Sequence, residues 1–207
     1  ILILFMSKKK KYTPLLLILF AFSLYCSITI GLALDEKHQL MHGKNTIDYF
    51  FSLGEINNYF NMRENYSAIY WSLLYFITEI FPIKFETEIT HIVNLIFSLC
   101  VIFGIGKLAE ELFNKKVGRI TFLILFFYPI FFGHMSINGK DTILALSHVW
   151  IFYLILRYLK KQKIKEKKNK YIVSIALLAS LSTGIQLTFL GSQIPIVLFL
   201  IFEIFFA

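Results

Sequence analysis

Residues 14–34 read PLLLILFAFSLYCSITIGLAL, a run of 21 residues without a charged side chain. About 20 consecutive apolar residues in a helix cross a hydrocarbon core roughly 30 Å thick. The four lysines Lys8–Lys11 before this run resemble the start of a signal peptide. The apolar run is too long for a signal peptide and lacks a small-residue cleavage end, so we expect a retained membrane span.

Five further apolar runs follow the first one along the chain. They predict membrane spans at about residues 89–106, 120–132, 142–158, 171–190 and 194–207. Apolar residues make up 57% of the sequence and charged residues 16%, against roughly 45–50% and 25% in soluble domains. The fold class that we expect is therefore all-α, a polytopic bundle of transmembrane helices.

One block, Ala68–Phe81, is apolar and aromatic but has only 14 residues, with Glu79 inside it and Pro82 after it. The positive-inside rule helps to decide whether it crosses the membrane. If it crosses, the basic run KKQKIKEKKNK at residues 160–170 is moved to the outer side. We therefore expect Ala68–Phe81 to lie on the outer surface as an amphipathic interfacial helix, inside a long outer loop at residues 35–88.

With this arrangement the charges separate between the two sides of the membrane. The segments at 8–11, 107–119 and 157–170 hold 16 basic and three acidic residues, and we expect them in the cytoplasm. The segments at 35–88 and 133–141 hold five basic and nine acidic residues. We expect a multi-pass protein of a bacterial inner (plasma) membrane with a cytoplasmic N-terminus. Its basic loops face anionic membrane lipids, and they need no nucleic acid as partner.

Two adjacent carboxylates, Asp35 and Glu36, follow the first span directly. They can be ordinary solvated residues of the interface. A carboxylate at this depth is also partly desolvated, which raises its basicity and suits it to accept a proton. Acidic residues near the membrane mark functional sites often enough that we favour the second interpretation.

A second polar cluster lies in the segment GHMSINGKD, residues 133–141, between the third and fourth spans. It contains the candidate residues His134, Asn138, Lys140 and Asp141. Asp141 can serve simply to stabilise the start of the following helix. Together with the first pair, however, these side chains can bind a phosphate and a divalent cation, with oxygen ligands favouring Mg or Mn and a histidine extending the choice to Zn.

Further polar residues are weaker candidates. Glu64 precedes the amphipathic block and either faces water or joins the same site, where with His134 it is a candidate metal ligand. His91, Asn94 and His148 lie within or near spans, and such residues are more often interhelical hydrogen-bonding groups than ligands. Cys26 and Cys100 lie in apolar runs and predict neither a disulfide framework nor a metal site.

The order of these features resembles the N-terminal half of the GT-C glycosyltransferases, in particular the protein O-mannosyltransferase and aminoarabinose-transferase branch. The resemblance rests on the DE pair after the first span, the loop KLAEELFNKKVGR, the YP that ends the third span, and GHMSINGKD. It extends from about Lys8 to Ala207. It implies an inverting transfer of a hexosyl or pentosyl group from a polyprenyl-phosphate donor to a protein, lipid or glycan acceptor at the outer face.

The resemblance also implies roles for individual residues. Asp35 matches the acid that acts as general base on the acceptor, and Asp141 matches the acid of the second outer loop that organises the site or its metal. Glu36, Lys140 and Asn138 become candidates for substrate or phosphate binding. Relatives have a Lys-Pro-Pro stretch after the position of Glu64, whereas this chain has Asn65-Tyr66-Ser67, so Lys140 is a candidate substitute for the phosphate-facing lysine.

Two other functions fit the same sequence. A transporter or flippase places ionisable residues near the middle of the bilayer, often on broken helices, whereas the acids here are expected at the outer boundary. A non-catalytic assembly subunit uses Asp35 and Asp141 only at helix starts. The chain begins before its first Met at Met6 and ends within an apolar run, so we expect a fragment of a longer enzyme.

Overall fold

The computed structural model describes residues 13–33, 35–56, 67–162 and 169–206, and this part of the chain contains helices and no strand. The helices are α2 (Thr13–Thr29), α3 (Glu36–Phe51), α4 (Ile69–Thr78), the 3₁₀ turn η3 (Ile83–Phe85), α5 (Glu86–Leu112), α6 (Lys115–Phe127), α7 (Pro129–His134), α8 (Gly139–Gln162), α9 (Asn169–Ile185) and α10 (Thr188–Phe206). The predicted all-α fold class is confirmed.

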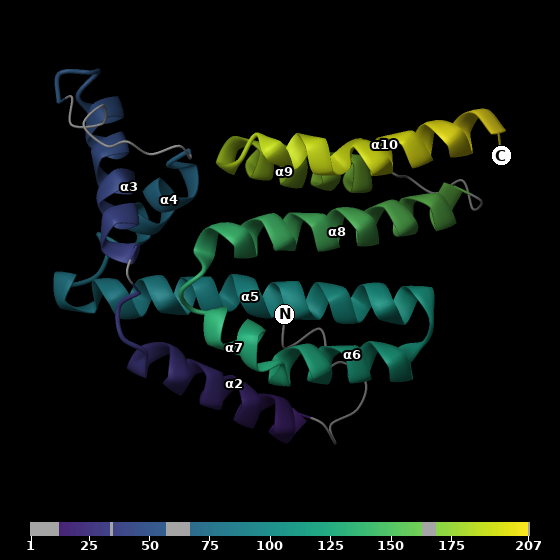
Figure 1. The fold of residues 1–207 in the computed structure, drawn as a ribbon, viewed down its shortest axis with the longest axis horizontal. Coiled ribbons are helices and arrows are strands. Elements are labelled where there is room, and N and C mark those ends of the chain that lie inside the picture. The colour runs from purple at the N-terminus through teal and green to yellow at the C-terminus, as the bar shows by residue number, and fades with distance from the viewer. Residues whose placement is uncertain (1–12, 34, 57–66, 163–168, 207) are drawn as a thin grey trace.

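Helix α5 forms the centre of the bundle, between α8 on one side and α2 with α6 on the other (Figure 1). Its side chains at Leu95, Val101 and Ile102 are at most 2% exposed. The segments Ile83–Leu112 and Gly139–Lys160 are long and apolar enough to cross a membrane, and α2, α9 and α10 are shorter apolar helices. Many large apolar side chains on these helices face outward, as lipid-facing surfaces do.

Two of the predicted spans contain breaks. The span expected at 120–132 is divided at Tyr128, which has an extended backbone (φ −70°, ψ 114°) before Pro129 opens α7. A residue before proline is disfavoured in the α region, and proline has no N–H for the helix. The span expected at 171–190 is likewise divided, because α9 ends at Ile185 and α10 begins at Thr188.

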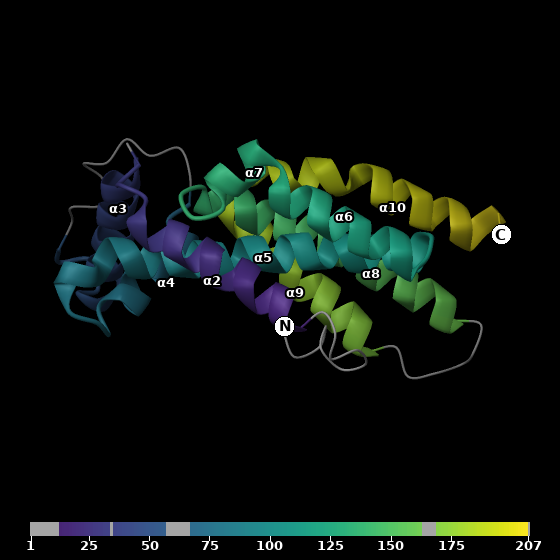
Figure 2. The same ribbon diagram turned by 90° about the horizontal axis from the view of Figure 1, so that it is seen from below.

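Helices α3 and α4 lie against each other across one end of the bundle, and α3 runs across the direction of α5 (Figures 1 and 2). They approach closely at Gly43, where an added Cβ would lie 2.3 Å from the carbonyl oxygen of Trp71. Leu40, Tyr70 and Leu74 from this pair form one buried cluster with Ile143 of α8 and Ile185. The block around α4 therefore packs on the end of the bundle and does not run beside α5 as another span.

The opposite end of the bundle carries basic side chains. Glu111, near the end of α5, accepts hydrogen bonds from Lys160 at 2.8 Å and from Arg157 at 3.4 Å, both on α8. The start of α6 is capped by Asn114, whose side chain accepts from the backbone N–H groups of Lys116 and Val117. The contacts of Glu111 join the end of α5 to α8, and the Asn114 cap fixes the start of α6.

Close contact between α5 and α6 depends on two glycines. A Cβ at Gly118 would lie 2.6 Å from the carbonyl oxygen of Gly106 and 2.9 Å from Glu110 Cβ.

Replacing Gly118 by valine is expected to separate α5 from α6 and to lower the free energy of unfolding by about 1–3 kcal/mol, the usual cost of overpacking. The thermal midpoint of the protein in detergent measures this loss. The matched change is Gly191→Val, because an added Cβ at Gly191 would meet no atom within 4 Å. It should leave that midpoint near the wild-type value, and equal midpoints for both variants would contradict the close packing of α5 and α6.

Candidate functional site

The junction between α2 and α3 presents one carboxylate to solvent and buries the next. Asp35 is exposed and immediately precedes α3, and its side chain caps no backbone N–H. Glu36 begins α3 and is only 3% exposed. The two acids thus have different surroundings although they are adjacent in the sequence.

Glu36 is held by His91, from the first third of α5. The Nε2 atom of His91 lies 2.8 Å from Oε1 and 3.0 Å from Oε2 of Glu36, and its Nδ1 lies 3.1 Å from the backbone oxygen of Ser27 on α2. The backbone N–H of Ala33 donates to Glu36 Oε2 at 2.8 Å. One histidine therefore connects α2, α3 and α5 at the point where Asp35 emerges. Glu36 was predicted to bind substrate or phosphate, whereas in the structure its carboxylate is buried and engaged in these contacts.

The turn between α7 and α8 contains the second polar cluster. The side-chain amide of Asn138 donates to Asp141 Oδ2 at 3.1 Å, and the carbonyl oxygen of Asn138 accepts from the Thr142 hydroxyl at 2.5 Å. Asp141 lies in the first turn of α8, where a carboxylate interacts favourably with the free N–H groups of the helix. Its side chain is nevertheless exposed, as is that of His134, while Lys140 is half-buried.

Two buried residues of α5 hold this turn through hydrogen bonds to its backbone oxygens. Asn94 donates to the backbone oxygen of Ser136 at 2.9 Å, and Ser98 donates to that of Met135 at 2.8 Å. Tyr70 of α4 donates its hydroxyl to Asn94 Oδ1. Burial raises the pKa of this Tyr70 hydroxyl above its ordinary value, so the group remains a donor at physiological pH.

Gly139 sits where α4, α5 and α8 meet. A Cβ at this position would lie 2.4 Å from Tyr70 Cε1 and 2.7 Å from Asn94 Oδ1. The absence of a side chain is therefore required for the turn to rest on Tyr70 and Asn94. This contact precedes Lys140 and Asp141 directly and sets the point at which they leave the bundle.

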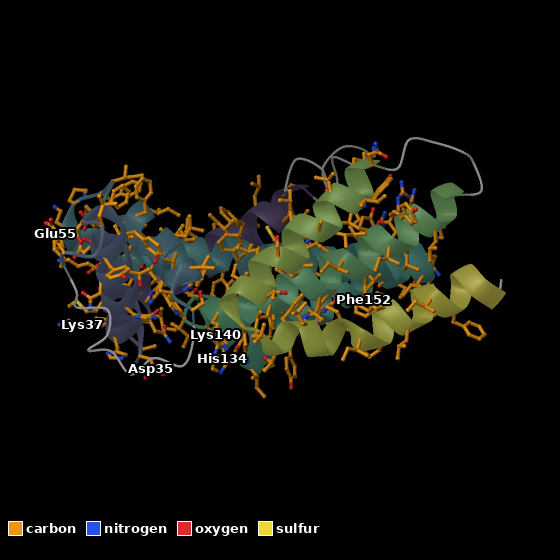
Figure 3. The ribbon with its side chains drawn as sticks, turned by 90° about the horizontal axis from the view of Figure 1, so that it is seen from above. Asp35, Lys37, Glu55, His134, Lys140 and Phe152 are labelled. Carbon is orange, nitrogen blue, oxygen red and sulfur yellow. The ribbon has the colours of Figure 1, made fainter. Side chains whose placement is uncertain are left out.

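The two clusters lie at the same end of the bundle. Figure 3 shows Asp35, His134 and Lys140 along one edge of the molecule, contributed by the α2–α3 junction, the end of α7 and the start of α8. All three lie toward the end that carries α3 and α4, away from the C-terminal turns of α8, which contain Arg157 and Lys160 (Figure 3). The arrangement offers one exposed acid at the α2–α3 junction and one in the first turn of α8, with a lysine and a histidine near the second acid in the chain.

The candidate metal ligands can be compared with this geometry in part. Within residues 13–33, 35–56, 67–162 and 169–206, no three His, Cys, Asp or Glu side chains are placed so that they could hold a metal ion together. Glu64, predicted as a ligand, lies outside the described residues. His134 is exposed at the end of α7.

The sequence predicted the general role of His91 and Asn94 but not the groups that they contact. His91 and Asn94 were expected to be interhelical hydrogen-bonding groups, and this is confirmed. Their partners were not predicted, and neither was the role of Ser98. The available signal was spacing, since residues 91, 94 and 98 share one face of a helix and alternate with apolar residues.

The comparisons with known proteins add a family. The family model described as dolichyl-phosphate-mannose-protein mannosyltransferase matches residues 68–206, which is more than half of the chain. The match includes α4, the polar residues of α5 and the α7–α8 turn, and it begins after Asp35 and Glu36. No curated protein and no solved structure matches the chain.

Proposed function

The chain belongs to the dolichyl-phosphate-mannose-protein mannosyltransferase family, and from this premise we propose that it transfers a sugar from a polyprenyl-phosphate carrier to an acceptor at the end of the bundle that carries Asp35 and Asp141. Membrane glycosyltransferase is the activity that the family implies. The donor, the outer face as the place of transfer and the residue roles below are our proposal. The acceptor is a protein, lipid or glycan.

One observation carries this proposal: a single helix, α5, anchors both of the segments that carry the acids. His91 holds the α2–α3 junction through Glu36, and Asn94 holds the α7–α8 turn through Ser136. These anchors lie within one helical turn of each other. A base and a phosphate-binding group must be kept in fixed relative positions for a displacement reaction, and a shared rigid support supplies this.

Asp35 is the residue that we assign as general base. It is the exposed member of the acidic pair, and its side chain has no capping duty. In the proposed step the Asp35 carboxylate takes the proton of the acceptor hydroxyl or amine, and the acceptor atom forms a bond to the anomeric carbon of the sugar. The bond between this carbon and the phosphate oxygen breaks, its electron pair leaves with the lipid phosphate, and attack from the opposite side inverts the configuration.

The leaving phosphate is assigned to the α7–α8 turn. Negative charge grows on the phosphate oxygen as the bond breaks, and a cation placed there stabilises it. Lys140 supplies the positive charge, and the start of α8 adds the favourable end of the helix dipole. Asn138 and Asp141 hold each other across this turn at 3.1 Å, which orders the segment that carries Lys140.

The choice of donor is tested with membranes that contain the protein. We expect a labelled sugar to move to product from a polyprenyl-phosphate donor, and not from the corresponding nucleotide sugar supplied without the lipid carrier. Membranes with Asp35→Asn protein provide the blank. Transfer from the nucleotide sugar in membranes depleted of polyprenyl phosphate would contradict the proposal.

Replacing Lys140 by alanine is expected to raise the KM for the lipid donor by about 10- to 100-fold, because a hydrogen bond to a charged group contributes about 1.5–3 kcal/mol. Steady-state transfer kinetics with varied donor measure this change. Lys44→Ala is the matched control, since Lys44 is an exposed lysine on α3, and it should leave the KM unchanged. If the two variants bind the donor equally well, Lys140 does not contact the phosphate.

A further inference from the structure

Two hydrogen bonds join Ala33 and Glu36, the residues on either side of the segment that contains Asp35. The backbone N–H of Glu36 donates to the carbonyl oxygen of Ala33 at 3.3 Å, and the backbone N–H of Ala33 donates to Glu36 Oε2 at 2.8 Å. The carbonyl oxygen of Asp35 accepts from the N–H of Gln39 at 2.9 Å. The Asp35 backbone thus has little freedom as long as the Glu36 carboxylate stays in place.

We propose that His91 is a positioning residue for the sugar transfer: by holding Glu36 it fixes the turn and with it the direction of the Asp35 carboxylate. This inference rests on the proposed function. The contact spans 55 positions in the chain and is buried on both sides, with His91 at 0% and Glu36 at 3% exposure. Nothing else among the described contacts joins Glu36 to α5.

The hydrogen-bonding chemistry of the contact is complete. The Ser27 carbonyl oxygen can only accept, so Nδ1 of His91 carries a hydrogen. The bond between Nε2 and the carboxylate needs one more proton, which resides on His91 or on Glu36. In either case the pair is neutral as a whole, and a neutral, fully bonded pair can remain buried where a lone carboxylate cannot.

The same chemistry predicts which substitutions preserve the turn. In Glu36→Gln the amide oxygen can accept from the Ala33 N–H, while the amide NH₂ donates to Nε2 of a neutral His91, whose Nδ1–H still donates to Ser27. No donor or acceptor is lost. In His91→Gln a single amide cannot reach both Ser27 and Glu36 as the imidazole ring does, so Glu36 loses its fixed support.

The experiment compares turnover and donor affinity in purified variants. We expect His91→Gln to lower kcat by about 10- to 100-fold, since a small displacement of a catalytic group costs up to about two orders of magnitude. The KM for the lipid donor should stay near the wild-type value, because the donor phosphate is assigned to the α7–α8 turn. Glu36→Gln should keep kcat within about threefold of the wild type, because its hydrogen bonds are retained.

A second histidine supplies the matched control. His148 of α8 bonds to the carbonyl oxygen of Leu144 at 2.9 Å and to the Ser192 hydroxyl at 2.7 Å, so it also joins two helices. His148→Gln should lower the thermal midpoint in detergent without changing kcat per folded molecule. A purely structural role for His91 predicts the same behaviour for His91→Gln, and equal kcat values in these two variants would overturn the inference.

The result also separates this inference from the proposed function. If Asp35→Asn is inactive while His91→Gln retains the wild-type kcat, the positioning role of His91 is refuted and the base role of Asp35 stands. If Asp35→Asn retains transfer, the base role fails, and with it the function that His91 was proposed to serve. A decrease in kcat for His91→Gln with an active Glu36→Gln variant supports both.

Discussion

Replacing Asp35 with asparagine is expected to lower sugar transfer by about 100- to 10,000-fold, the usual contribution of a general base. Asparagine has nearly the same shape but cannot take the proton from the acceptor. The initial rate of transfer from a polyprenyl-phosphate sugar, per molecule of protein in the membrane, measures the loss.

The same variant should fold as well as the wild type. Asp35 is exposed and its side chain makes no capping hydrogen bond to α3, so its replacement is expected to leave the described part of the fold intact. The thermal midpoint in detergent checks this expectation. Glu55→Gln is the control, because Glu55 is an exposed acid after α3 at the same end of the bundle (Figure 3). Retained transfer in Asp35→Asn would remove Asp35 from the mechanism, and retained function in the double variant Asp35→Asn, Asp141→Asn would favour an assembly subunit.

Replacing Gly139 with alanine is the second change for which we expect a large effect. The new Cβ would lie 2.4 Å from Tyr70 Cε1 and 2.7 Å from Asn94 Oδ1, so the α7–α8 turn must move away from both. We expect a loss of about 1–3 kcal/mol of stability and a decrease in transfer of about 100-fold, because the displaced turn carries Lys140 and Asp141. Thermal unfolding and transfer rates are measured on the same preparation.

Gly133 provides the comparison for this experiment. It lies at the end of α7 near the same turn, but a Cβ there would meet no atom within 4 Å. Gly133→Ala is therefore expected to leave stability and transfer unchanged. The double variant Gly139→Ala, Tyr70→Ala should recover part of the transfer, since it removes the ring that the new Cβ meets. Full activity of Gly139→Ala alone would contradict the close contact of the α7–α8 turn with Tyr70 and Asn94.

Much of the fold is predictable from hydropathy and charge. The apolar runs predict the all-α bundle because a membrane-crossing helix needs about 20 apolar residues. The helix breaks at Tyr128 because the next residue, Pro129, lacks the N–H that a continuing helix requires. The distribution of lysines, a global property that does not depend on any one contact, predicts that the block around α4 lies on the outer surface, and the side of the membrane that it faces stays a prediction.

The details of the candidate site could not be predicted in the same way. Asp35 and Glu36 are adjacent acids, and the buried one, Glu36, contacts His91, which lies 55 residues further along the chain. The need for a glycine at position 139 arises from the Tyr70 ring, which belongs to another helix. Such contacts join residues far apart in the chain, and a single sequence does not record which polar residues meet.

The central requirement of the proposed site is that Asp35 and the α7–α8 turn face the same compartment. It is tested by single-cysteine labelling of sealed vesicles of known orientation with a membrane-impermeant maleimide, in protein whose two cysteines are removed by Cys26→Ser and Cys100→Ala. We predict that cysteines introduced by Lys37→Cys and Gly133→Cys react from the same side, and that the one introduced by Lys115→Cys reacts only from the other. Labelling of the first two positions from opposite sides would separate the acids by a bilayer and contradict the account.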